Sequence, residues 1–156
     1  MKIRRASFQL AVATLVLPLL FGGCGDDLVA PGDVTFAPEL GVDLEEMRKL
    51  ESGVYVKTLQ VGLGSYSVDA ADSVDLSYTL WLPNGMEVES GEISRYLTSL
   101  IPGFRDGVVD MVVGEIRLVV VPPERGYGES PPSGSGIPPN SYLVFRVELL
   151  KVAGVP

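Results

Sequence analysis

The most constraining feature of the chain is a nine-residue segment, 74–82, in which every second side chain is apolar or aromatic. Most of the side chains between them are polar, and this period of two is typical of a β-strand with one buried face. The dipeptide Asn84-Gly85 follows and favours a tight turn, so residues 86–89 are predicted to return as the hairpin partner. The fold must therefore bury one side of an antiparallel hairpin.

Three further segments are predicted to be strands. Residues 54–61 are followed by a glycine, residues 116–121 form an almost continuous apolar run, and residues 143–149 alternate again. An apolar run of that length between turn signals indicates a central strand buried on both faces. The sheet is therefore predicted to have its centre near 116–121.

One short helix is predicted before this central strand. Phe104, Val108 and Met111 recur at helical spacing, and Gly114 lies where a C-cap glycine belongs. Strands combined with a single helix place the chain in the α+β class, as an antiparallel sheet wrapped against that helix.

A long loop, 122–141, separates the last two strands and contains six prolines. Loops of this length inside a compact domain are usually functional or disordered. We expect an ordered loop beside a pocket, because Tyr127 between Gly126 and Gly128 has little reason to serve as core.

The N-terminal region is typical of an export signal. Three basic residues among the first five precede an apolar run, 6–20, that is short for a membrane-spanning helix. The string 20–23, Leu-Phe-Gly-Gly, stands before Cys24 and resembles a bacterial lipobox. We therefore predict a lipoprotein signal peptide over 1–23 and a lipid on Cys24. The alternative is an ordinary exported chain with an unpaired thiol.

Residues 24–51 are predicted to be an acidic tether with one short helix over 43–50, and residues 52–154 the folded domain. In the helix segment acids precede bases, as the helix dipole favours. A dimerisation arm is the alternative for so short a helix. Trp81 is expected to be either an exposed apolar side chain or a contact with the tether.

Charge and composition exclude several kinds of function. The chain has no histidine, which excludes Ser-His-Asp and Cys-His catalysis, and its single cysteine cannot form an internal disulfide. The net charge is −8, and loss of Lys2, Arg4 and Arg5 with the signal would bring it to −11. Nucleic-acid binding is therefore not expected, and neither a cofactor nor a metal is.

Several segments, in order, resemble the FKBP-type peptidyl-prolyl cis-trans isomerases. Residues 74–85 are similar to a strand and turn of that family. The other similar segments are 101–104 with 107–115, 122–128, 137–141 and 143–152, so that the resemblance extends over roughly 52–152. It implies a bent antiparallel sheet around one short helix, with an apolar pocket between them.

The resemblance also implies the site residues. Catalytic roles fall to the Tyr127 hydroxyl near the substrate carbonyl, to the backbone N–H of Ile101 and to Glu89. The substrate-binding residues that it implies are Tyr78, Val88, Leu100, Ile101, Phe104, Tyr127, Ile137 and Phe145.

Two departures from the family lie close together. Val88-Glu89 stand where the family has Phe-Asp, and the connection 91–100 is short and lacks phenylalanine. These departures predict weaker activity, by about 1–3 kcal/mol for each lost aromatic wall. The expected function is a monomeric prolyl isomerase for exported proteins, lipid-anchored to the bacterial envelope and facing the periplasm or exterior. The alternative is a non-catalytic chaperone or binding module with the same fold.

Overall fold

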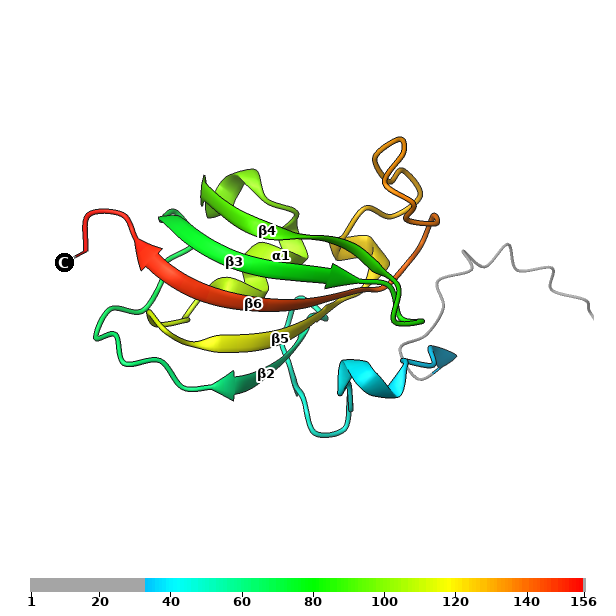
Figure 1. Ribbon diagram of the computed structural model, residues 1–156, viewed down its shortest axis with the longest axis horizontal. Coiled ribbons are helices and arrows are strands. Elements are labelled where there is room, and N and C mark those ends of the chain that lie inside the picture. The colour runs from blue at the N-terminus through cyan, green and yellow to red at the C-terminus, as the bar shows by residue number, and fades with distance from the viewer. Residues whose placement is uncertain (1–32, 156) are drawn as a thin grey trace, which may run out of the picture.

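A six-stranded antiparallel sheet forms the centre of the computed structural model, which describes residues 33–155 (Figure 1). The strand order is β1-β2-β5-β6-β3-β4. The strands are β1 Arg48–Lys49, β2 Tyr55–Gln60, β3 Ser73–Trp81, β4 Glu87–Tyr96, β5 Ile116–Val121 and β6 Leu143–Val152. The helix α1, Pro102–Val108, lies across one face of the sheet, here called the helix face. Three short 3-10 helices are η2 Pro38–Leu40, η3 Leu97–Ser99 and η4 Pro123–Arg125.

The predicted α+β class is confirmed. The strands expected at 54–61, 74–82, 116–121 and 143–149 correspond to β2, β3, β5 and β6. Every residue of β5 is buried, as its apolar run predicted, because α1 covers one face of this strand and a second apolar cluster covers the other.

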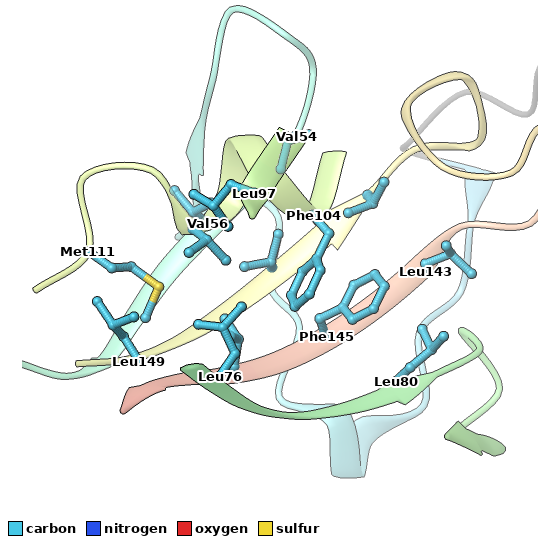
Figure 2. Packing of buried hydrophobic residues seen from close by; sticks show 14 of the residues in the cluster. Val54, Val56, Leu76, Leu80, Leu97, Phe104, Met111, Leu143, Phe145 and Leu149 are labelled. Atoms are coloured by element: carbon cyan, nitrogen blue, oxygen red, sulfur yellow. The ribbon is translucent and has the colours of Figure 1, made fainter. Parts of the chain in front are cut away.

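The main hydrophobic core lies between α1 and the helix face (Figure 2). Leu76, Met111 and Leu149 are fully buried at one end of this core, and Phe104 meets Phe145 at its centre. At roughly 1.5–3 kcal/mol for each large apolar side chain, this burial is the main stabilising contribution to the domain.

The hairpin partner is longer than predicted. β4 pairs with β3 from Glu87 to Tyr96, so most of the connection 91–100 is strand. Its apolar pattern is weak because β4 is an edge strand, with most of its side chains in solvent. The short connection without phenylalanine therefore still forms a strand, which supplies no aromatic residue to the pocket.

The helix is shorter than predicted. α1 ends at Val108, Asp110 takes a positive φ of 66°, and Gly114, with φ 84°, lies in a later turn rather than at the helix C-cap. The Arg117 guanidinium accounts for this ending, because it donates to the carbonyl oxygens of Gly107 and Val109 at 2.9 and 3.0 Å. Those carbonyls are among the groups that a helix end leaves unpaired.

The helix predicted over 43–50 is wrong. The chain makes a turn there, in which the Asp43 carboxylate accepts from the Glu45 amide at 3.0 Å, and then extends into β1. A helix of one to two turns gains little stability by itself. Pairing of Arg48 and Lys49 with Val56 and Tyr55 along β2 supplies backbone partners that a solvated helix would not have.

The segment 33–47 packs on the face of the sheet opposite α1. Its apolar residues join a second cluster built on Met47, Tyr55 and Tyr142, and Phe36 meets the Tyr142 ring edge-on at 6.3 Å and 89°. Trp81 packs on the same cluster, so its contact with the tether is the correct alternative. The predicted acidic tether is therefore part of the fold from residue 33 onward. No helix in residues 33–155 could span a membrane, and the predicted signal and lipid site lie outside this range.

Candidate active site

A cavity of about 290 Å³ opens beside the N-terminal end of α1. Its walls come from β3, β4, β6, the end of η3, α1 and the loop after η4. The lining residues are Tyr78, Leu80, Glu89, Ile93, Ser99, Leu100, Ile101, Phe104, Tyr127 and Phe145.

Three aromatic rings form the base of this pocket. Phe104 stacks on Phe145, with ring centroids 4.5 Å apart and planes at 18° (Figure 2). Tyr78 lies against both, at 5.8 Å from Phe104 and 6.5 Å from Phe145. Offset aromatic contacts of this kind add to the stability gained by burial alone. The base is therefore rigid and apolar.

Two glycines of α1 bring Phe104 to this position. A Cβ on Gly103 would lie 2.3 Å from a Val121 methyl, and one on Gly107 would lie 2.4 Å from a Val119 methyl. Only glycine permits so close an approach of the helix to β5. The ring of Phe104 is thereby pressed onto β6.

Tyr127 is held at the pocket by hydrogen bonds of its own loop. The Gly128 amide donates to the Pro123 carbonyl at 3.0 Å, and the Asn140 amide donates to the Gly128 carbonyl at 2.7 Å. Gly128 has a φ of 53°, in the left-handed region that glycine adopts without strain. The predicted ordered loop beside a pocket is thus what the structure has.

Both pocket tyrosines stay protonated well above neutral pH. Burial, followed by a hydrogen bond to Glu89 and its negative charge, raises the pKa of Tyr78 to about 12. Burial, and then the charge of Glu89, also raises the pKa of Tyr127. The Tyr127 hydroxyl is therefore available as a hydrogen-bond donor to a ligand, whereas the Tyr78 hydroxyl donates to Glu89.

A backbone donor lies at the same pocket. Ile101 directly precedes α1, and within residues 33–155 its N–H has no hydrogen-bond acceptor. An unpaired amide beside an apolar cavity can bind a carbonyl oxygen of a ligand. No group of three or more acidic or cysteine side chains in the described part of the chain is placed to hold a metal ion.

Seven of the nine predicted site residues line this pocket, whereas Val88 and Ile137 do not. A β-bulge pairs Glu87 with Trp81 and Glu89 with Leu80, and Val88 is the extra residue between them. Val88 packs instead against the main core, and so does Ile137, which is 8% exposed.

Three lining residues, Leu80, Ile93 and Ser99, were not predicted. Leu80 lies on the same alternating face as Tyr78, so the pattern of β3 contained the signal for it. Ile93 was missed because the length of β4 was missed. Ser99 belongs to η3, for which the sequence has no distinct signal.

The fold and the pocket define an α+β domain that can enclose a small apolar group among aromatic rings. The family model for FKBP-type peptidyl-prolyl cis-trans isomerase matches residues 64–150, more than half of the chain. The chain therefore belongs to the FKBP-type peptidyl-prolyl cis-trans isomerase family.

Curated relatives agree with this assignment. The FKBP-type isomerase FkpA of Escherichia coli is 36% identical over 126 residues, which are 78% of this chain and 44% of the relative. A probable FKBP-type isomerase of Haemophilus influenzae is 35% identical over 113 residues, 69% of this chain and 46% of the relative. The chain thus spans less than half the length of these two relatives.

Solved structures show the same fold. The crystal structure of E. coli FkpA matches with a TM-score of 0.63 and 33% identity, over 70% of this chain and 53% of that one. The crystal structure of AtFKBP13 matches with a TM-score of 0.62 and 25% identity, over 69% of this chain and 99% of that one. The predicted FKBP-like architecture is confirmed.

Proposed function

We propose that this protein catalyses cis-trans isomerisation of X-Pro peptide bonds in unfolded polypeptides that bind in the aromatic pocket. The observation that carries the proposal is the base of Phe104, Phe145 and Tyr78 with two unused donors at its walls, the Ile101 N–H and the Tyr127 hydroxyl. A proline ring is apolar and small enough for the cavity, and it is followed and preceded by carbonyl groups that such donors can bind.

The chemistry requires no acid or base. Rotation about the peptide bond has a barrier of roughly 18–20 kcal/mol because twisting breaks amide resonance. The planar amide is the more polar state, so an apolar pocket destabilises it relative to the twisted one. Stabilising the twisted state preferentially is what lowers the barrier. Glu89 takes part by accepting a hydrogen bond from Tyr78, which orients that ring in the base of the pocket.

Replacing Tyr127 with phenylalanine should lower kcat/KM about threefold to tenfold, because one net hydrogen bond to the substrate carbonyl is lost. The assay is protease-coupled isomerisation of a proline tetrapeptide. Tyr66→Phe is the matched control, since its hydroxyl donates to Asp72 on the surface at 3.0 Å, away from the pocket. Equal rates in the Tyr127→Phe variant and the original chain would contradict the assigned role.

Isomerase activity on an uncharged peptide should be constant from pH 6 to pH 9. The raised pKa values of Tyr78 and Tyr127 keep both hydroxyls protonated in this range, and the chain has no histidine. The same shifts stabilise the fold below the unfolded tyrosine pKa of about 10, and this stabilisation is lost as the pH rises towards 12. A pH–rate profile tests the statement about activity, and alkaline denaturation curves test the statement about stability. A bell-shaped rate profile centred near pH 7 would contradict the first statement, and stability that does not fall between pH 10 and pH 12 would contradict the second.

A proline-limited refolding reaction tests the proposed function as a whole. Acceleration of the slow phase by the purified protein, lost in Tyr127→Phe, is expected. The alternative function, a non-catalytic chaperone or binding module, predicts suppressed aggregation of unfolded clients without any change in that phase.

We propose further that the protein is exported, that its clients are exported proteins, and that it is a monomer anchored to the envelope through a lipid on Cys24. The support is the sequence before Cys24, with its basic start, apolar run and small residues. Labelling of growing bacteria with a radioactive fatty acid should mark the original chain and leave a Cys24→Ser variant unmarked. Membrane association should be lost in the same variant.

A further inference from the structure

Glu89 is the only charged residue that lines the pocket formed by the described part of the chain. Its side chain is exposed, so solvent and ligands can reach the carboxylate. The rest of the lining is apolar, aromatic or hydroxyl-bearing. The pocket wall therefore has a single negative charge with no cation beside it in the lining.

The exposed Gly91 leaves open space beside this carboxylate, here called the notch. Gly91 follows Glu89 on the same face of β4 and pairs with Tyr78 of β3. A Cβ added at Gly91 would meet no atom within 4 Å. Since Ile93 is the next residue on this face, the notch lies between a carboxylate and an apolar side chain. A long side chain with an apolar stem and a charged end fits such a surface.

The other charged residues of β4 do not pair with Glu89. Glu92 pairs with Ser77, and so belongs to the alternate face of the strand. Arg95 does share the face of Glu89, and its positive charge acts on the Tyr78 hydroxyl, whose pKa it lowers against the larger raising effects of burial and Glu89. Among the described residues, however, no ion pair joins Arg95 to Glu89.

The position of a substrate relative to Glu89 follows from the proposed function, on which this inference rests. In that function we assign to the Tyr127 hydroxyl the carbonyl of the rotating X-Pro bond, which belongs to the residue preceding proline. Tyr127 and Glu89 line the same cavity, and the charge of Glu89 contributes to the raised pKa of Tyr127. The side chain that precedes proline therefore extends from a point close to Glu89 and the Gly91 notch.

We propose that Glu89 and the notch at Gly91 make the site selective for proline preceded by a basic residue, with Lys-Pro and Arg-Pro segments favoured and Glu-Pro segments disfavoured. An ion pair at about 4 Å in a largely aqueous setting changes affinity by roughly fivefold. The selectivity is therefore modest and sensitive to salt.

The test compares kcat/KM of the full-length protein for Ala-Xaa-Pro-Phe peptides with lysine, leucine or glutamate at Xaa. The original chain should favour lysine over glutamate by about 25-fold in low salt, because attraction of one charge and repulsion of the other each contribute about fivefold. The ratio of kcat/KM for the lysine peptide to that for the glutamate peptide should approach one in the Glu89→Gln variant, which keeps a hydrogen-bond acceptor for Tyr78. The same ratio should approach one for the original chain in 0.5 M sodium chloride. Glu92→Gln removes the same charge from the alternate face and should leave the ratio unchanged.

The notch has its own variant. Gly91→Leu fills the open space. It should lower kcat/KM for the peptides with lysine or leucine at Xaa relative to a peptide with alanine at Xaa. No strain is expected, because Gly91 lacks a positive φ.

The Glu89→Gln variant decides the proposal as a whole. If the ratio of kcat/KM for the lysine peptide to that for the glutamate peptide is the same in this variant as in the original chain, the proposal is wrong.

Binding of the same peptides, measured by calorimetry, separates the two proposals. If the protein catalyses no isomerisation, the proposed function fails. A charge preference in binding that depends on Glu89 would then still support selectivity, and equal binding of lysine and glutamate peptides would refute it.

Discussion

Replacing Phe145 with alanine should abolish most of the isomerase activity and lower the free energy of unfolding by about 3–5 kcal/mol. The side chain is 3% exposed and stacks on Phe104 at 4.5 Å, so its loss opens a cavity in the core and removes the base of the pocket. At least a tenfold fall in kcat/KM is expected when the rate is corrected for the folded fraction, since roughly 1.4 kcal/mol of lost transition-state binding has that effect.

Leu149→Ala is the matched control for this variant. Leu149 is on the same strand, fully buried in the same core, and absent from the pocket lining. The Leu149→Ala variant should lose a comparable free energy of unfolding, about 2–5 kcal/mol, but keep its kcat/KM per folded molecule. Urea denaturation followed by fluorescence of the single tryptophan gives the stability, and equal catalytic losses in both variants would contradict a specific role for Phe145.

Arg117→Leu should cost about 3–5 kcal/mol of stability because it leaves a buried charge unpaired. The Arg117 guanidinium lies 2.8 Å from the carboxylate of Glu115, and these residues are only 5% and 6% exposed. It also donates to the carbonyls of Gly107 and Val109 at the end of α1. The variant therefore loses an ion pair and the partner of two carbonyl groups together.

Two further variants test this explanation. Adding Glu115→Gln to Arg117→Leu should restore part of the lost stability, because the unpaired charge is then gone. Lys57→Met removes the exposed Lys57–Glu46 ion pair from the neighbouring strand and should hardly change the unfolding midpoint. A small effect of Arg117→Leu, below about 1 kcal/mol, would show that the pair is dispensable.

The sequence predicted elements well where burial imposed a simple period. β3 and β6 alternate because one face of each packs on the main core, and β5 is apolar throughout because both of its faces are covered. In these strands the local pattern and the tertiary environment agree. The aromatic residues Tyr78, Phe104 and Phe145 belong to these regular elements or to α1, but it was the family resemblance and not the periodicity that assigned them to the pocket.

Prediction failed where long-range contacts decided the outcome. The helix expected at 43–50 is replaced by pairing with β2, and the end of α1 is set by Arg117, nine residues beyond Val108. The length of β4 was hidden because an edge strand needs few apolar residues. The bulge between Leu80 and Trp81 removed Val88 from the pocket lining, and no local signal in the sequence indicates such a shift of pairing.

The packing of residues 33–47 on the sheet has a consequence for the proposed anchoring. Only nine residues separate Cys24 from Val34, which already packs on the domain. Even a fully extended chain of that length reaches roughly 30 Å. A lipid-bearing form would therefore be confined to a thin layer at the bilayer surface. It would meet polypeptides as they emerge from the membrane and would not diffuse through the rest of the space outside the membrane.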